Sequence, residues 1–330
     1  MSRKLASIQK VLDVQAISGA DKIECVSILG WKIVAQKGIH TLNQLIVYIE
    51  IDSVLPERPE FEFLRNRKFR IKTIKLRGQI SQGICFPLAI LPEGTQVEEG
   101  LDVTDILGVS KYEIPIPPQL RGLIKGSFPG YLRKTDEPRI QSFPEVLNEI
   151  KEKYVYITEK VDGTSVTFSH KDGEIEICSR NLSLKETEDN LYWKIFRKYN
   201  IEKILKELGN FAIQGEIAGP GIQKNPLGLQ EHQLFIFNVY DINRHCYENF
   251  FSFNEICNRY NLPKVKILWK DVKFVWSIEN LLEMAKGTYE SNKPREGIVI
   301  RPMLELYSST LKDRLSFKVI NNDYLLKCEE

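Results

Sequence analysis

Short apolar runs separated by turn residues fill the first third of the chain. Their alternation and length predict strands over residues 6–14, 24–29, 32–36, 45–49, 69–76 and 83–87. Several short strands at this spacing are typical of a small β-barrel. We therefore expect an N-terminal barrel over residues 1–115.

Basic residues follow the predicted strand over 69–77, but they change faces halfway along it. Those before Thr73 would lie on one side of the strand and those after it on the other. A β-bulge near Thr73 would return them all to one side, where they could follow a phosphate backbone. An edge strand kept soluble by its charges is an equally good reading of the same pattern. The candidate nucleic-acid contacts are Arg70, Lys72, Lys75 and Arg77.

Proline and glycine are concentrated between residues 108 and 130, which predicts a break between domains. We place a linker over 116–130 and a second domain over 131–330. A chain of 330 residues is long enough for two such domains, each with its own core.

The first candidate catalytic residues of the second domain follow the apolar run over 154–157. There Glu159, Lys160 and Asp162 precede Gly163. A lysine at a strand end is a candidate nucleophile if desolvation, a nearby cation or a metal exposes its lone pair. Asp162 would face the same side and could hold a metal through water. A surface turn is the simpler reading, and for this motif alone it is favoured.

The rest of the domain predicts alternating strands and helices. A hairpin over 166–177 ends at Arg180, a helical pattern spans 186–208, and apolar strands over 211–216 and 234–240 carry Glu216 and Phe237. The loop between those strands contains Lys224, which we expect to lie over a polynucleotide. Two further apolar strands are predicted. One begins after Glu296, and the other carries Lys318.

Composition narrows the possible functions. The net charge of +2 is small, so any affinity for nucleic acid must come from local patches. The six cysteines form no Cys-x-x-Cys pair, which argues against a zinc cluster or a disulfide framework. The N-terminus has no long apolar run, and we expect an intracellular, soluble protein without membrane contact.

The motif Lys160-Val161-Asp162-Gly163, followed by four further motifs in order, resembles the covalent nucleotidyltransferases, which are polynucleotide ligases and capping enzymes. The later motifs are those at Arg180, Glu216, Glu296 and Lys318. The resemblance implies that Lys160 takes a nucleotide as a phosphoramidate. It also implies a nucleotide site of Glu159, Arg139, Arg180, Glu216, Phe237, Glu296 and Lys318, and metal contacts through Asp162, Glu216 and Glu296. One departure is Ser316, where the family often has a lysine.

Domain order narrows the resemblance. DNA ligases and capping enzymes place their OB fold after the last motif, whereas only twelve residues follow Lys318 here. An OB-type barrel before the lysine resembles the RNA ligase branch, which implies an α+β fold, ATP with Mg2+ or Mn2+, and a monomer acting on nicked RNA or RNA/DNA duplex. Two alternatives remain open: a GTP-specific capping enzyme, and an RNA-binding barrel protein whose second half is inert.

Overall fold

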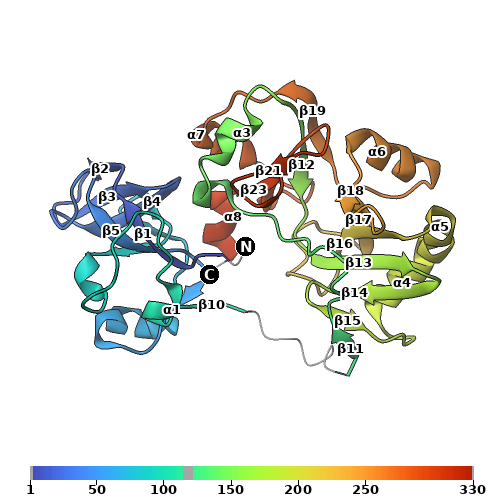
Figure 1. Ribbon diagram of the computed structural model, residues 1–330, viewed down its shortest axis with the longest axis horizontal. Helices are drawn as coiled ribbons and strands as arrows, with labels where there is room; N and C mark the ends of the chain where they lie inside the picture. The colour runs from blue at the N-terminus through green and yellow to red at the C-terminus, as the bar shows by residue number, and fades with distance from the viewer. Residues whose placement is uncertain (1–2, 114–121, 329–330) are drawn as a thin grey trace. The chain divides into compact units, whose positions relative to one another are not determined.

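The computed structural model describes residues 3–113 and 122–328, and the chain divides into two compact units (Figure 1). The first contains Met1–Pro115, Ile140–Pro144 and Leu325–Glu330, and the second contains Ile116–Arg139 and Glu145–Tyr324. Part of the expected linker, residues 116–121, lies outside the described residues. Two short segments that are distant in sequence thus complete the N-terminal unit.

Short antiparallel strands build the N-terminal unit. One sheet has the order β1-β5-β9 and another the order β2-β3-β4; the hairpin β7-β8 and the two-stranded pair of β6 with the distant β10 complete the strands. The strands are β1 (Ala6–Lys10), β2 (Asp13–Ala16), β3 (Ile23–Ile28), β4 (Trp31–Gln36), β5 (Leu45–Ile49), β6 (Ser53–Val54), β7 (Ile74–Leu76), β8 (Gln79–Ser81), β9 (Ile84–Phe86) and β10 (Ser110–Lys111). The short helices η1 (Pro59–Arg67), η2 (Leu88–Ile90) and α1 (Thr104–Leu107) connect them.

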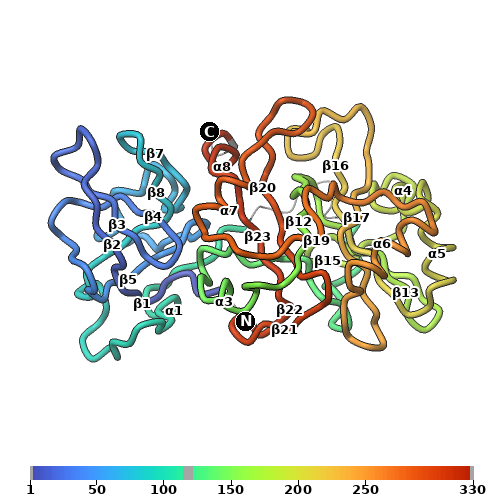
Figure 2. The backbone as a smooth tube through the Cα atoms, turned by 90° about the horizontal axis from the view of Figure 1, so that it is seen from above, coloured from blue at the N-terminus to red at the C-terminus, as the bar shows by residue number. Residues whose placement is uncertain are grey.

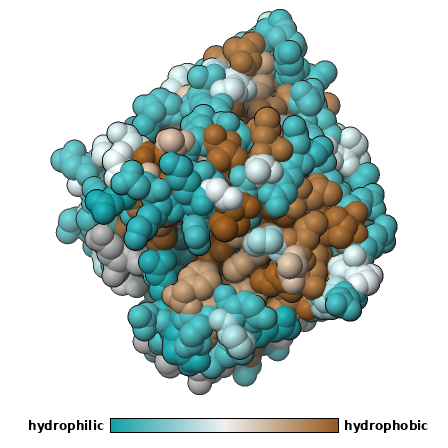
Figure 3. Space-filling view, turned by 90° about the vertical axis from the view of Figure 1, so that its left-hand side faces the viewer, coloured by the Kyte–Doolittle hydropathy of each residue, from teal (hydrophilic) through white to brown (hydrophobic). Residues whose placement is uncertain are grey.

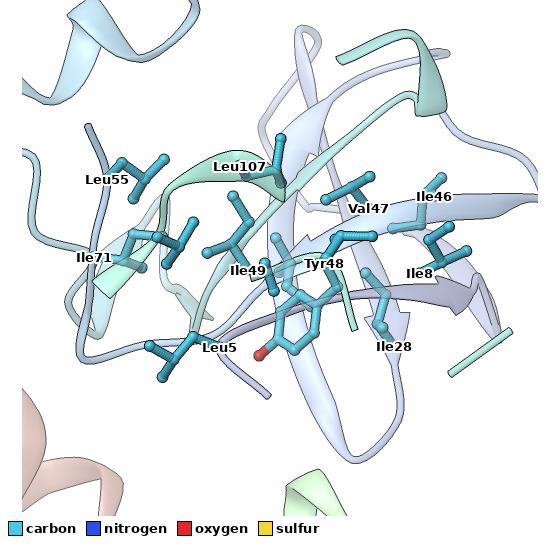
Figure 4. Packing of buried hydrophobic residues seen from close by; sticks show 14 of the residues in the cluster. Leu5, Ile8, Ile28, Ile46, Val47, Tyr48, Ile49, Leu55, Ile71 and Leu107 are labelled. Atoms are coloured by element: carbon cyan, nitrogen blue, oxygen red, sulfur yellow. The ribbon is translucent and has the colours of Figure 1, made fainter. Parts of the chain in front are cut away.

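Apolar side chains from these strands meet in one core. Figure 4 shows Ile8 of β1, Ile28 of β3, and Ile46 and Tyr48 of β5 gathered in this core. The Tyr48 hydroxyl lies within this core and donates to the carbonyl oxygen of Gln82 over 2.9 Å, which satisfies its polar end. The core explains why strands of only two to six residues hold together.

The prediction of a strand over 69–76 is wrong for its first half. Only Ile74–Leu76 is a strand, and Lys68 and Phe69 have positive φ angles of 51° and 57°. These left-handed residues end η1 and turn the chain, so the basic residues do not share one strand face through a bulge. Thr73 is buried instead.

The second unit contains a seven-stranded antiparallel sheet with the order β11-β15-β14-β13-β16-β17-β18. Its strands are β11 (Ile124–Ser127), β13 (Thr164–Lys171), β14 (Glu174–Cys178), β15 (Leu182–Leu184), β16 (Phe211–Ala218), β17 (Gln233–Asp241) and β18 (Cys246–Tyr247). The helices α4 (Leu191–Lys198), α5 (Ile201–Leu208) and α6 (Phe250–Arg259) pack their apolar sides on it, and they lie beside it in both Figure 1 and Figure 2. The single helix expected over 186–208 is two, because Asn200 at φ 50° ends the first.

A second, four-stranded sheet has the order β19-β12-β20-β23. Its strands are β12 (Tyr154–Lys160), β19 (Ile267–Lys273), β20 (Gly297–Pro302) and β23 (Phe317–Ile320), with the small hairpin of β21 (Tyr307–Ser308) and β22 (Asp313–Arg314) nearby. The remaining helices are η3 (Ile140–Ser142), α3 (Val146–Ile150), α7 (Ile278–Ala285) and α8 (Asn322–Cys328). Antiparallel sheets flanked by helices confirm the α+β class.

The surface mixes polar and apolar residues. The face in Figure 3 carries hydrophobic areas between hydrophilic ones. Exposed large apolar side chains of the N-terminal unit include Leu12, Ile39, Leu42 and Val97. Within the described part of the chain, no helix combines the length and hydropathy needed to cross a membrane.

Candidate active site

The candidate nucleophile lies at the end of a central strand. β12 ends at Lys160, which pairs across the sheet with Gly297 at the start of β20. A Cβ added at Gly297 would lie 2.2 Å from the carbonyl oxygen of Val319, so glycine is required for β20 and β23 to approach here. The Lys160 amine donates to Glu296, with 2.7 Å between Nζ and Oε2.

The turn after Lys160 brings the two sheets together. A Cβ at Gly163 would lie 2.4 Å from the carbonyl oxygen of Ile217, so this glycine allows the turn to rest against β16. Ser165 on β13 pairs with Glu216 on β16. Glu216 and the buried Asp162 thereby come close enough to act electrostatically on Lys160. The three carboxylates predicted for the metal are thus gathered around one amine.

The charges of this cluster are unbalanced. Burial alone would lower the pKa of Lys160, but Glu296, Glu216 and Asp162 outweigh it and raise that pKa. Burial, with the neighbouring carboxylates, raises the pKa of Asp162 to about 7 and that of Glu216 to about 8. One cation cannot neutralise three carboxylates in a low-dielectric site, so the cluster favours a further cation.

The donor set fits a divalent cation. Within residues 3–113 and 122–328, no three His, Cys, Asp or Glu side chains are placed to ligate one ion together. Asp162, Glu216 and Glu296 surround one amine and could hold an ion through water molecules, which Mg2+ usually retains. Burial and the neighbouring carboxylates raise the pKa values of Asp162 and Glu216, and a bound dication would offset that negative charge.

Two predicted cations lie together at β23, the strand next to β20 in the sheet. Arg139 forms a parallel bridge with Lys318, whose backbone N–H donates to the carbonyl oxygen of Pro138 over 2.8 Å. Burial, with the positive charges of Lys160 and Arg139, lowers the pKa of Lys318 to about 7. Such crowding of cations favours binding of an anion such as phosphate.

Arg180 stands at the end of β14, and Asp136 accepts two hydrogen bonds from its guanidinium. The electrostatic influence of Glu216 and Glu296 also reaches it. Arg180 is half-exposed, so it remains accessible to a ligand.

A β-bulge in β17 places an aromatic residue, Phe237, near the candidate nucleophile. Gln214 pairs with Asn238 and Gly215 with Ile236, which leaves Phe237 as the extra residue of β17. Phe237 packs in a cluster with Val161. This places an aromatic ring beside the residue that follows Lys160. Glu159 lies on the other side of Lys160 in sequence, and burial raises its pKa.

The predicted nucleic-acid residues differ in exposure and in their partners. Arg70 bonds Asp52 over 3.4 Å and its guanidinium lies 3.7 Å from the centre of the Tyr112 ring, so it is occupied within the N-terminal unit. Lys72 is partly buried, whereas Lys75 and Arg77 are exposed at the β7-β8 turn. In the second unit, Lys224 is exposed on a loop that Gln223 joins to the Gly163 carbonyl over 3.3 Å.

Sequence reasoning missed a buried charge network beside Ser316. Ser316 is fully buried next to Glu137, and Glu137 accepts a hydrogen bond of 2.9 Å from Arg301. Arg314 pairs with Glu305 in the same network. Burial would raise the pKa of Glu137, but both arginines outweigh it and lower that pKa. The signal in the sequence was Arg301 itself, a charge within an otherwise apolar strand.

Comparison with known proteins assigns this site to a family. Residues 153–320 match the family described as RNA ligase, and residues 5–88 match a family of OB-fold domains. No curated protein is significantly similar in sequence. Among solved structures, Naegleria gruberi RNA ligase with PPi is 34% identical, each chain covering 98% of the other, with a TM-score of 0.89.

Two variants of that Naegleria gruberi enzyme are equally similar. A lysine-to-alanine variant with ATP and Mn and a glutamate-to-alanine variant with AMP and Mn each give 34% identity, 98% coverage of both chains and a TM-score of 0.90. The similarity covers 98% of this chain and so extends over both units. The chain belongs to the RNA ligase family, with an OB-fold domain preceding the ligase domain.

Proposed function

We propose that this protein is an ATP-dependent RNA ligase that seals a 3′-OH to a 5′-phosphate through a lysyl-AMP intermediate. The observation that carries the proposal is the placement of Lys160, a strand-end amine enclosed by three carboxylates and near the cations Lys318 and Arg180. The solved structures of its relative with ATP and Mn and with AMP and Mn support ATP as the nucleotide and a divalent metal as cofactor.

In the first step, the Nζ atom of Lys160 attacks the α-phosphorus of ATP. Lys160, an ammonium in the resting site, first loses one proton to expose its lone pair, and Glu296, at 2.7 Å, is placed to accept it. A P–N bond then forms while the P–O bond to pyrophosphate breaks, and the nitrogen releases a second proton. Lys318 and Arg180 would hold the phosphates, and Phe237 would stack on the adenine. A bound Mg2+ or Mn2+ ion would offset the charge of the triphosphate and of the carboxylates.

The next two steps transfer and then release AMP. An oxygen of the RNA 5′-phosphate attacks the lysyl-AMP phosphorus, which returns the electron pair of the P–N bond to Lys160. The 3′-OH then attacks the activated 5′-phosphate and AMP departs with its bridging oxygen. In-line positioning and charge stabilisation supply most of the acceleration in such transfers. The substrate we propose is a nick in RNA or RNA/DNA duplex, with RNA on the 3′-OH side.

We assign a separate role to each domain. Residues 1–115 form an OB-fold domain that holds the polynucleotide, residues 116–130 link it, and residues 131–330 form the adenylyltransferase domain. The exposed pair Lys75 and Arg77 supports the first assignment, since cationic grooves on OB folds follow nucleic-acid backbones. The convergence of the nucleotide-site residues in the second unit supports the last.

Covalent labelling tests the proposal directly. Incubation with ATP labelled at the α-phosphate and a divalent metal, followed by denaturation, should leave label on the chain. Label from GTP in preference to ATP would instead identify a capping-type enzyme. A chain that takes no label from either nucleotide, while it binds RNA, would overturn the ligase proposal.

A further inference from the structure

The connection between α7 and β20 carries a tyrosine beside the nucleophile. Tyr289 is only 4% exposed. Its own loop is braced, because Tyr289 N–H donates to the Lys293 carbonyl over 2.9 Å and Asn292 N–H donates to the Tyr289 carbonyl over 3.0 Å. A further backbone bond of 3.0 Å joins Arg295 to Gly287. These backbone bonds order the loop that carries the buried Tyr289 ring.

The Tyr289 hydroxyl makes three hydrogen bonds, all to backbone atoms of the active site. It donates to the Lys160 carbonyl over 2.7 Å. It accepts from the N–H of Asp162 over 3.2 Å and from the N–H of Glu296 over 3.0 Å. A phenol has one proton to donate and a small acceptor capacity, so these three bonds use its polar groups.

These three hydrogen bonds lie just beyond the end of the pairing between β12 and β20. The pairing of β12 with β20 ends at Lys160 and Gly297. Asp162 and Glu296 lie just beyond that last pair, so sheet hydrogen bonds do not fix them to each other. The hydroxyl of Tyr289 joins the two segments at this point. Its partners Lys160, at the end of β12, and Glu296, just before β20, are separated by more than a hundred positions in sequence.

We propose that Tyr289 is a positioning residue for lysine adenylylation, which fixes Lys160 and Glu296 relative to each other through their backbones. The inference rests on the proposed function for its catalytic consequence. The hydroxyl does not touch the reacting atoms, so its loss should alter the placement of the amine without removing a nucleotide contact. A misplacement of about 1 Å can cost about 100-fold in rate.

The substitution Tyr289→Phe removes the hydroxyl and retains the ring. It leaves the Asp162 and Glu296 amides and the Lys160 carbonyl without this partner. The single-turnover rate of adenylylation at saturating ATP should fall by about 10- to 100-fold, with little change in the KM for ATP. Tyr199→Phe is the matched control, because it removes a tyrosine hydroxyl that accepts from the Leu234 N–H over 3.4 Å in the same unit.

Amide hydrogen exchange of the full chain gives a readout independent of activity. The Asp162 and Glu296 amides should be protected in the unsubstituted protein and exchange faster in Tyr289→Phe but not in Tyr199→Phe. A saturating rate within twofold of the original, or unchanged exchange at both amides, would overturn the inference. If the unsubstituted chain took no label from ATP, the proposed function would fail, while exchange would still decide whether Tyr289 holds the two amides. Rapid exchange of both amides in the unsubstituted protein would overturn the inference even if the Phe variant did not fold.

Discussion

The Lys160 amine and the Glu296 carboxylate form an ion pair with 2.7 Å between Nζ and Oε2. Although burial disfavours the charged amine, this carboxylate and its two neighbours raise the pKa of Lys160. A protonated amine has no lone pair with which to attack phosphorus. The ion pair therefore describes a resting state, and adenylylation requires that the pair separate and the amine lose its proton.

Replacing Lys160 should abolish covalent labelling. Lys160→Ala removes the nucleophile, and Lys160→Arg places a guanidinium there that stays protonated near neutral pH. Mass spectrometry of the unsubstituted chain should find AMP on Lys160 alone. Lys151→Ala, at an exposed lysine before the same strand, is the control and should label normally. Label retained by either Lys160 variant would identify a different nucleophile.

The affinity for ATP should depend on pH through Lys318. Its pKa of about 7 means that the ammonium form, which binds phosphate, is lost as the pH rises through neutrality. Between pH 7 and 9, binding must then take up a proton, which weakens affinity by at most about tenfold per pH unit. Calorimetry with α,β-methylene ATP, which cannot lose pyrophosphate at that bond, measures this affinity. Lys318→Arg keeps its charge, and its affinity should vary less with pH. Identical profiles for the two proteins would contradict the role of Lys318.

Restoring a lysine at position 316 should not improve this enzyme. Ser316 is fully buried beside Glu137, in a network whose two arginines already balance its two glutamates. Ser316→Lys would add volume and an unbalanced charge, and we expect a loss of about 1–3 kcal/mol in the free energy of unfolding. Urea unfolding measures the loss, and Ser309→Lys, on an exposed position, controls for the added charge. Faster adenylylation without loss of stability would show that position 316 faces the nucleotide.

Local patterns explain why much of the site could be predicted from the sequence. Lys160 and Glu296 stand at the ends of recognisable apolar strands and Glu216 lies within one, so the strand pattern indicates where each side chain appears. Tyr289 and Glu137 gave no such signal. Their roles arise from partners far away in sequence, which periodicity does not reveal.

In the N-terminal barrel, a local pattern led to a wrong strand prediction. Alternating charges predicted one continuous strand over 69–76, but left-handed conformations at Lys68 and Phe69 interrupt it. Packing decides this segment, because Phe69 and Ile71 both enter the core. Their burial takes precedence over the strand propensity of the run.

The charged turn between β7 and β8 should contribute to RNA binding. Lys75→Ala with Arg77→Ala removes two exposed cations, whereas Arg70 is held by Asp52 and serves the fold. Loss of two phosphate contacts should reduce the slope of log affinity against log salt by about 2. Lys22→Ala with Lys37→Ala removes the same charge from exposed positions of the same unit and is the control. Equal slopes for both double variants would show that the turn has no specific role.

Fast sealing should require RNA in the strand that supplies the 3′-OH. A 2′-OH both donates and accepts hydrogen bonds and favours the A-form sugar, so a site that contacts the terminal nucleotides can distinguish ribose from deoxyribose there. The 5′-phosphate strand is activated through its phosphate, which both kinds of nucleic acid share.

Nicked duplexes that differ only in the sugars of the 3′-OH strand should therefore be sealed at different rates by enzyme already carrying AMP. Ribose at the last one or two positions should suffice for fast sealing, and an all-DNA 3′-OH strand should be sealed slowly. The same substitutions in the 5′-phosphate strand are the control and should change the rate little. Equal rates for ribose and deoxyribose at the 3′ end would show that the enzyme does not require RNA there.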